Sequence, residues 1–229
     1  TLDKLMAKKC FVADGIPTPK YFTTTSSEHL EECNSVGFPL MVKPCYEGTS
    51  KGISKFSRVE DDEGLARQVD LVVGQYHQPA LVEEFIKGSE FTVVVFGNEE
   101  PDAMPVIQYA IGNRVDLGNE FYTFEHVKEE SVKYLCPAQI PVGLTKKLQD
   151  LAVQTYLSVG CRDFGRVDFR VDEKGRPFVL EINPLPNLSK KDTFFHVAQA
   201  LGRPFEEMVL RALDEGLARL HLKTHEVEV

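Results

Sequence analysis

Residues 166–182 constrain the fold of this chain more than any other stretch, because apolar and polar residues alternate on both sides of Lys174-Gly175. Alternation of this kind predicts two antiparallel strands joined by a tight turn. A two-residue turn at Lys174-Gly175 defines the register and places Asp168 directly opposite Glu181. The sequence therefore predicts a β-hairpin that carries two adjacent carboxylates.

The same register divides the other side chains of the hairpin between two faces. Arg166 lies opposite Asn183, and because side chains two apart on a strand share a face, both join the carboxylates on one side. The other side is apolar and is expected to enter a core through Val167, Phe169, Leu180 and Ile182. The hairpin should thus cover a core with one face and present its polar residues on the other.

Two carboxylates side by side repel each other unless a cation neutralises them. Oxygen-only ligands favour a hard ion such as Mg²⁺ or Mn²⁺, Asn183 adds a neutral oxygen, and the remaining coordination positions would suit the phosphates of a nucleotide. The alternative is a salt bridge among Arg166, Asp168 and Glu181 on a solvated face. The apolar opposite face favours the metal interpretation.

A second feature is a lysine in an apolar strand. Lys43 ends the strand-like run 40–43, where a buried cation is costly unless an anion meets it. The loop that follows, residues 47–52, has glycines and hydroxyl groups, and its backbone N–H groups could surround phosphate oxygens. It lacks the GxxxxGK[ST] pattern of a P-loop. An ordinary turn, with Lys43 reaching solvent from an edge strand, is the alternative.

Residues 81–90 form a third feature, a strand that runs into a short turn. Its apolar residues could hold a flat adenine, and its carboxylates could hold ribose hydroxyls; a strand that leaves the core through a polar turn is the alternative. Each of the three features is weak alone. Together they describe a site for ATP and a divalent cation.

The rest of the chain mixes helical and strand patterns. A first helix is expected to begin at an N-cap Thr1 and end before Gly15, and a second to begin near Ser26 and Ser27. Further helices are predicted over residues 61–73, 148–159 and 205–217, and further strands over 80–86, 91–97 and 103–110. Residues 112–141 show no repeat and are expected to form a long lid or substrate loop.

Composition excludes several classes of protein. A net charge of -9 disfavours nucleic acid as a partner. The longest apolar run, residues 91–96, is far shorter than the roughly 20 residues that a membrane-spanning helix needs. Five cysteines without a CxxC pair indicate the reduced thiols of a cytoplasmic protein.

Because Thr1 opens directly into a helical pattern, the chain is expected to be part of a longer protein.

The order of these features along the chain resembles that in the ATP-grasp superfamily. The amino-acid sequence is most similar to that of the D-alanine:D-alanine ligase family, over residues 1 to about 220. The matching runs are Leu2-Asp3-Lys4-Leu5, Val42-Lys43-Pro44 with Glu47-Gly48-Thr49-Ser50, Val82-Glu83-Glu84-Phe85-Ile86 with Gly88 and Glu90, Tyr134-Leu135-Cys136-Pro137-Ala138, Arg166-Val167-Asp168-Phe169, and Glu181-Ile182-Asn183-Pro184-Leu185-Pro186. The resemblance implies an α+β, ATP-grasp fold, in which two subdomains with mainly antiparallel sheets clasp ATP. The small subdomain would comprise residues 1–84 and the large one 85–222, with 223–229 a frayed tail.

The resemblance also implies roles for individual residues. ATP would be bound by Lys4, Lys43, Glu47, Gly48, Thr49, Ser50, Glu83, Glu84, Phe85, Ile86 and Glu90. Within this set, Lys4 and Lys43 would contact the phosphates, residues 83–86 the adenine and Glu90 the ribose. Two Mg²⁺ (or Mn²⁺) ions would be held by Asp168, Glu181 and Asn183, and catalysis would use Arg166, Lys43 and Ser50. The implied reaction transfers the γ-phosphoryl group of ATP to a carboxylate, after which an amine attacks the acyl phosphate to form an amide.

The chain departs from the family pattern at its substrate-binding positions. The implied substrate residues are Lys128, Arg166, Asn187, Ser189 and Asp192. Lys128 is near the family's loop lysine but not aligned with it, and Asp192 falls where the family has a serine that binds the substrate carboxylate. An anion there should repel a carboxylate, so the second substrate is expected to differ from D-alanine. By the resemblance, the family's N-terminal domain, which supplies part of the first amino-acid site, is expected to lie outside this chain.

Three functions follow as hypotheses. The first is an ATP- and Mg-dependent carboxylate-amine ligase that acts on small amino acid or carboxylate substrates, with a full-length protein that could be a homodimer. The second is an ATP-binding regulatory module without ligase activity, and the third is an ATP-grasp kinase that stops at a phosphorylated product.

Overall fold

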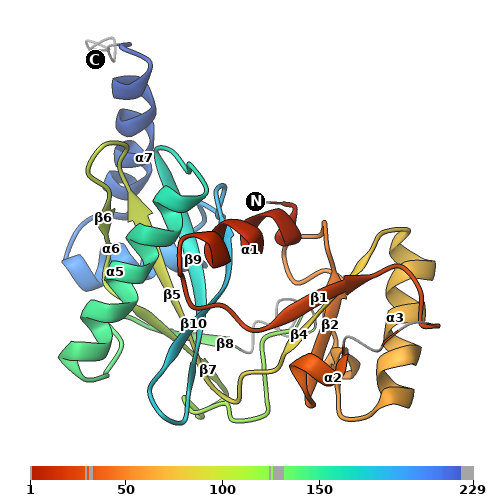
Figure 1. Ribbon diagram of the computed structural model, residues 1–229. Helices are drawn as coiled ribbons and strands as arrows, with labels where there is room; N and C mark the ends of the chain where they lie inside the picture. Colours follow the sequence, from red (N-terminus) through yellow and green to blue (C-terminus); the bar gives the residue numbers. More distant parts are fainter. Residues whose placement is uncertain (1, 29, 31–32, 124, 126–131, 223–229) are drawn as a thin grey trace.

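The computed structural model describes residues 2–28, 30, 33–123, 125 and 132–222, and it contains two antiparallel sheets that lie beside each other (Figure 1). The predicted fold class, α+β with mainly antiparallel sheets, is confirmed. The expected cap Thr1 and the predicted frayed tail 223–229 lie outside the described residues. The first described helix, α1 (Lys4–Ala13), begins at Asp3, whose side chain accepts a hydrogen bond from the backbone N–H of Met6.

The first sheet has four strands in the order β1 (Tyr21–Thr24), β4 (Ala80–Glu84), β2 (Leu40–Pro44) and β3 (Arg58–Val59). Helix α3 (Asp62–Tyr76) packs across one face, because Leu65, Val69 and Val72 form an apolar stripe at helical spacing. Short helices α2 (Cys33–Val36) and η1 (Lys55–Ser57) complete this part of the chain.

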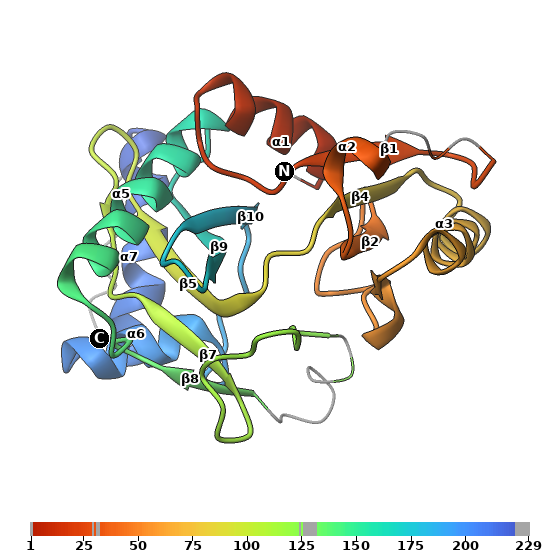
Figure 2. The same ribbon diagram turned by 60° about the horizontal axis from the view of Figure 1, so that its bottom comes forward.

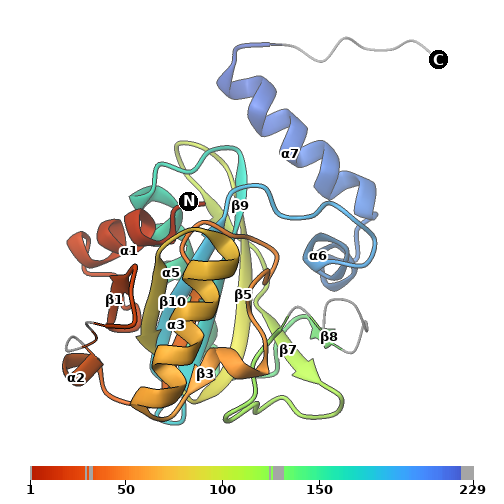
Figure 3. The same cartoon turned by 90° about the vertical axis from the view of Figure 1, so that its right-hand side faces the viewer.

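The second sheet has six strands: β10 (Pro177–Asn183), β9 (Phe164–Asp172), β5 (Gly88–Phe96), β7 (Ile107–Ile111) and β8 (Val132–Leu135) in that order, with β6 (Asp102–Ala103) paired to β5. Helices α1 and α5 (Val142–Ser158) cover one face, and α6 (Thr193–Leu201) and α7 (Phe205–Arg219) cover the other (Figures 1 and 3). On β5, Val93 and Val95 enter the first core whereas Val94 and Phe96 enter the second. Both faces of β5 are therefore buried, which explains why its sequence is apolar throughout.

The hairpin between β9 and β10 has the expected cross-strand partners near the cleft but a different turn. Asp168 pairs with Glu181, as predicted, whereas nearer the turn Pro177 pairs with Val171. The turn has three residues rather than two, since Asp172 and Arg176 close it, and the register shifts between Val179 and Glu181. A bulge there adds one residue to β10 and restores the predicted pairing of the carboxylates.

The bulge corrects the expectation for Leu180. This residue was predicted to enter the core, but as the extra residue of the bulge it lines the cleft instead, and Val179 takes the core position. Val167, Phe169 and Ile182 lie in the core as predicted.

Two further boundaries differ from prediction. The region 112–141 was expected to lack regular structure, yet it contains β8, a half-exposed edge strand of four residues that is too short to show a repeat. The predicted strand 103–110 is divided into β6 and β7 with Pro105 between them, because proline has no N–H to donate to a ladder.

Helix α1 precedes the first sheet in sequence but packs on the second. Ala7, Phe11 and Ile16 belong to the core beneath β9, β10 and α5, and Figure 2 shows α1 above β9 and β10, beside α5. The division of the chain at residue 84 into two subdomains stays a prediction. Within the described ranges, no helix combines the length and the hydropathy needed to cross a bilayer.

Candidate active site

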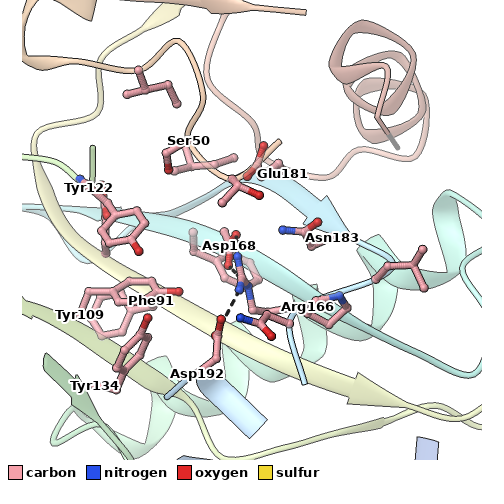
Figure 4. A pocket seen from close by; sticks show the side chains of 18 of the residues that line it. Ser50, Phe91, Tyr109, Tyr122, Tyr134, Arg166, Asp168, Glu181, Asn183 and Asp192 are labelled. Carbon is pink, nitrogen blue, oxygen red and sulfur yellow. Dashed lines mark hydrogen bonds and ion pairs between the residues drawn. The ribbon is translucent and has the colours of Figure 1, made fainter. Parts of the chain in front are cut away.

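A cleft of about 420 Å³ lies where the two sheets meet (Figure 4). Lys43 on β2 lines it from the first sheet, and Glu90, Asp168 and Glu181 on β5, β9 and β10 line it from the second. A smaller cavity of about 70 Å³ adjoins it and shares Lys43 and Glu90. The structure thus brings together residues from distant parts of the sequence.

A third cavity, of about 10 Å³, lies beside the loop 47–52 and shares Lys43 with the other two. Most of the predicted site residues line one of these three cavities: Lys4, Lys43, Glu47, Gly48, Thr49, Ser50, Glu83, Glu84, Phe85, Ile86, Glu90, Arg166, Asp168, Glu181, Asn183, Asn187 and Asp192. Ser189 does not line any of the three, and Lys128 lies outside the described residues. The roles assigned to these residues stay predictions.

The carboxylate of Asp168 is held from both sides. Arg166 donates to it twice, from Nε to Oδ1 at 3.0 Å and from Nη2 to Oδ2 at 2.9 Å, and the hydroxyl of Thr92 donates to Oδ1 at 2.5 Å. Burial raises the pKa of Asp168 despite these partners, and the negative charge of Glu181 adds to the rise. A further positive charge near Asp168, such as a metal ion, would therefore lower its pKa and favour the ionised carboxylate.

Glu181 meets a different cation. Its Oε2 lies 3.1 Å from Nζ of Lys4. The same Nζ also donates a hydrogen bond to the backbone carbonyl of Glu47, in the loop that follows β2. Burial alone would raise the pKa of Glu181, but Lys4 and Lys43 outweigh it and lower the pKa. One acidic side chain of the hairpin is thus poised to stay ionised at neutral pH.

These residues fit the predicted divalent cation by the chemistry of their donor atoms. Asp168, Glu181 and Asn183 offer only oxygen ligands on the protein side and face the cleft together. No group of three or more His, Cys, Asp or Glu side chains that could hold a metal ion occurs in the described part of the chain. Mg²⁺ usually takes one or two carboxylates and completes its shell with phosphate oxygens and water, so two carboxylates and an amide suit it.

Lys43 is positioned by a buried network that sequence reasoning missed. Its Nζ lies 2.5 Å from Oε1 of Glu83, whose Oε2 lies 2.8 Å from Nζ of Lys8. Lys8 is fully buried and also donates to the hydroxyl of Thr18 at 2.7 Å. Burial alone would raise the pKa of Glu83, but the two lysines lower it to about 2. The spacing of Lys4, Lys8 and Phe11 on one face of α1 was the available sign of a buried lysine.

The ion pairs of Glu83 leave its carboxylate no free oxygen for a nucleotide. Glu83 lines the smaller cavity, as expected of an adenine-contacting residue, but its carboxylate is occupied by Lys8 and Lys43. Contact between the backbone of this segment and an adenine stays a prediction.

The predicted phosphate loop has a tight, partly left-handed backbone. Thr49 and Ser50 have φ values of 53° and 54°, and the N–H of Lys51 donates to the carbonyl of Gly48 at 3.0 Å. A left-handed β-branched residue is uncommon and costs energy. Such geometry turns the two hydroxyl residues toward the large cleft, which both of them line.

The smaller cavity is apolar on one side. Met41, Phe85 and Phe121 form a cluster there, and the rings of Phe85 and Phe121 meet edge to face with centroids 5.7 Å apart. The guanidinium of Arg170 lies 4.9 Å from the ring centroid of Phe85. The flat aromatic walls suit an aromatic ring system such as a nucleobase.

Glu90, expected to bind ribose, is paired within the protein. Arg170 donates to its carboxylate at 2.7 Å and also to the carbonyls of Gly88 at 2.8 Å and Gly118 at 3.0 Å. Burial raises the pKa of Glu90 although Arg170 opposes the rise. Arg170 on β9, which was not among the predicted site residues, thereby ties Gly88 and Glu90 of β5 and the loop around Gly118 to β9.

Three tyrosines at one end of the cleft were also missed as site residues. Tyr109, Tyr122 and Tyr134 line the cleft, and only Tyr134 lies in a run that had pointed to the family. The rings of Tyr109 and Tyr122 are stacked with centroids 5.7 Å apart, and Tyr134 meets Tyr109 edge to face at 5.4 Å.

Comparison with known proteins gives consistent matches. The family model described as D-ala D-ala ligase C-terminus matches residues 11–214. The D-alanine–D-alanine ligase of Bordetella avium is 31% identical over 222 residues, which cover 96% of this chain and 67% of that protein. The D-alanine–D-alanine ligase structure from Bacillus anthracis has a TM-score of 0.78 at 26% identity, over 95% of this chain and 68% of that one. A structure of the same enzyme complexed with ATP has a TM-score of 0.76 at 24% identity, over 95% and 66%.

The chain spans about two thirds of the length of these relatives. The matches support the prediction of an ATP-dependent ligase, and the fold of the chain is that of the ATP-grasp ligases. With its cleft, its paired carboxylates and a family model that covers most of its length, the chain belongs to the D-alanine–D-alanine ligase family.

Proposed function

We propose that the whole protein is an ATP- and Mg²⁺-dependent ligase that joins a carboxylate to an amine through an acyl phosphate. The observation that carries the proposal is the meeting of Asp168 and Glu181 in a cleft that also holds Lys43 and Arg166. The relatives named D-alanine–D-alanine ligase support the same reaction class.

Nucleotide binding is assigned to the two smaller cavities and the adjoining part of the cleft. The cluster of Met41, Phe85 and Phe121 would hold the adenine, and Glu84, Ile86 and Glu90 line the same cavity. Lys4 and Lys43 converge on the loop 47–52, where their charges would meet phosphate oxygens. Glu83 keeps Lys43 charged and directed toward the cleft.

The metal-binding role is assigned to Asp168, Glu181 and Asn183, with two Mg²⁺ (or Mn²⁺) ions as the proposed number. The ions would offset the negative charge that spreads over the phosphoryl oxygens during transfer. Arg166 and Lys4 now neutralise the two carboxylates, and both cations can turn toward phosphate when the acids meet a metal.

The residues of the cleft can support both halves of the reaction. In the first half, a substrate carboxylate oxygen attacks the γ-phosphorus of ATP and ADP leaves. Lys43, Ser50 and Arg166 line the cleft and would stabilise the negative charge that develops on the phosphoryl oxygens. An amine then attacks the acyl carbon. The C–N bond forms, the C–O bond to phosphate breaks, and the proton lost by the nitrogen leaves with the phosphate.

The test uses the full-length protein, Mg²⁺, ATP and a panel of amino acids and amines, with ADP release as the signal. Asp168→Asn and Glu181→Gln should each abolish ADP release while circular dichroism shows an unchanged fold. Glu173→Gln is the matched control, because this exposed acid lies on the same hairpin and pairs with Lys87 outside the cleft. Full activity in the Asp168→Asn/Glu181→Gln double variant contradicts the proposal.

The other two hypotheses give different results in the same assay. A regulatory module would bind Mg-ATP without releasing ADP with any substrate pair. A kinase would release ADP but accumulate a stable phosphorylated product with no amide.

The remaining assignments concern substrates and setting. We propose small amino acid or carboxylate substrates, bound with the help of Arg166, Asn187, Ser189 and Asp192, and with Lys128 from outside the described residues. The five free cysteines of the structure suit the reducing cytoplasm. A homodimer of the full-length protein is proposed from the family resemblance and is measurable by analytical ultracentrifugation.

A further inference from the structure

The end of the cleft beyond Arg166 has its own chemistry. Tyr109 on β7, Tyr134 on β8, Tyr122 from the segment between them and Asp192 before α6 all line it. In Figure 4 the three rings lie together on one side of the cavity, and the side chain of Asp192 points from below toward Arg166. This end is therefore enclosed by aromatic rings and one carboxylate.

Asp192 is held but not fully engaged. Its Oδ1 accepts a hydrogen bond from the backbone N–H of Thr193 at 2.6 Å, which caps α6, and lies 3.6 Å from Nη1 of Arg166. Among the described residues, nothing donates a hydrogen bond to its Oδ2. The side chain is about four-fifths buried, but Oδ2 is not among the fully buried atoms that lack a partner, so it opens onto the cleft. A carboxylate oxygen that faces a cleft without a protein donor can accept a hydrogen bond from a ligand.

The charges around Asp192 leave an excess of negative charge. Among the described residues, Arg166 is the cation that pairs with Asp192, but its Nε and Nη2 are already bound to Asp168. His196 stacks on Tyr134 with centroids 4.8 Å apart, and burial lowers its pKa, so it is neutral at pH 7. One guanidinium thus serves two carboxylates.

The tyrosines give this end of the cleft uncharged aromatic walls. Tyr109 stacks on Tyr122 and Tyr134 stacks on His196, so one face of each ring is covered, and a cation beside the second face would be attracted to it. Burial raises the pKa of Tyr122 and Tyr134, and the negative charge of Asp192 raises both further. Their hydroxyls therefore remain protonated, and the rings carry no charge of their own.

We infer that the amine acceptor carries a second cationic group, as a diamine does, in place of the carboxylate of an α-amino acid. The inference rests on the proposed ligase function. One nitrogen of the acceptor would be the nucleophile near Arg166 and Asp168, and the other, as an ammonium group, would donate to Oδ2 of Asp192 among the three rings. An acceptor carboxylate at this position would instead face Asp192, with the guanidinium of Arg166 already shared between Asp168 and Asp192.

The test is calorimetry on the full-length protein with Mg²⁺ and the non-hydrolysable ATP analogue adenylyl imidodiphosphate. The probes are 1,4-diaminobutane and D-alanine, titrated separately. We expect the diamine to bind at least about tenfold more tightly than D-alanine, as one charge-assisted hydrogen bond warrants. Asp192→Asn should remove that preference, and because asparagine caps helices as well as aspartate does, α6 keeps its N-cap.

Glu206→Gln is the matched control. It removes one negative charge from an exposed acid on α7 that pairs with Lys190 outside the cleft, so the affinity for the diamine should not change. D-alanine binding as tightly as the diamine, or an Asp192→Asn variant with unchanged diamine affinity, overturns the inference and leaves the ligase proposal intact. Failure to bind the ATP analogue overturns both.

Discussion

Replacement of Glu83 by glutamine tests whether the buried network Lys8–Glu83–Lys43 holds the two sheets together. Glu83 is almost fully buried and is the shared counter-ion of both lysines, at 2.8 Å and 2.5 Å. Its pKa is about 2 in the folded protein against an ordinary value of 4.5. The two values differ by about 2.5, which corresponds to roughly 3 kcal/mol of stability at neutral pH.

The expected result is a loss of about 3 kcal/mol in the free energy of unfolding of Glu83→Gln at pH 7, measured by urea denaturation of the full-length protein. The variant leaves two buried ammonium groups near each other without an anion, which is the costly way to break a buried ion pair. Because Lys8→Met removes one of those charges, the double variant Lys8→Met/Glu83→Gln should recover on the order of 2 kcal/mol relative to Glu83→Gln.

The pH dependence gives an independent check. The folded-state pKa of Glu83 is lowered, so its contribution to stability is present above pH 4.5 and is lost as the pH falls toward about 2. The wild type should lose this stability within that window, and Glu83→Gln should lose less. A Glu83→Gln protein within about 1 kcal/mol of the wild type at pH 7, or a double variant no more stable than the single one, would refute the reasoning.

Three further predictions concern the backbone and the metal. Gly88→Ala should lower the free energy of unfolding, measured by urea denaturation, by more than about 3 kcal/mol, because a Cβ there would lie 2.0 Å from the carbonyl oxygen of Val171 at a φ of 148°. As the control, Gly74→Ala on exposed α3 places a Cβ that meets nothing within 4 Å and should be neutral or slightly stabilising. Equal effects of the two substitutions would contradict the prediction. Thr49→Gly should raise the free energy of unfolding by up to about 1 kcal/mol, since it relieves a left-handed β-branched residue, and a loss of that size would count against the strain. Treatment with EDTA should abolish ADP release and added Mg²⁺ should restore it, whereas activity that resists EDTA would exclude the proposed cation.

The hairpin shows how far the sequence alone can be taken. Alternation predicted which polar residues of the hairpin face the cleft and that Asp168 meets Glu181, since the side-chain period of a strand is a local property. The turn length was wrong and the bulge was missed, because Leu180 suits a regular strand and a bulge equally well. The two errors compensate, so the carboxylates meet as predicted for an incorrect reason.

Contacts between distant segments could not be predicted. Lys8 and Glu83 are 75 positions apart, and no local pattern pairs a helix residue with a particular strand residue. The tyrosine cluster depends on the pairing of β7 with β8, and β8 is too short and too exposed for its register to be inferred. Family resemblance supplied the order of the site residues, whereas their charge partners became visible only in the folded chain.

The placement of α1 has a practical consequence for anyone who divides this protein into fragments. A fragment that ends at residue 84 would carry the four-stranded sheet together with a helix whose apolar residues, Ala7, Phe11 and Ile16, have lost the surface that covers them. The complementary fragment would expose the matching hollow over β9 and β10. Because the same helix also supplies Lys8 to Glu83 and Lys4 to Glu181, the two halves should be soluble and well folded only when they are produced together.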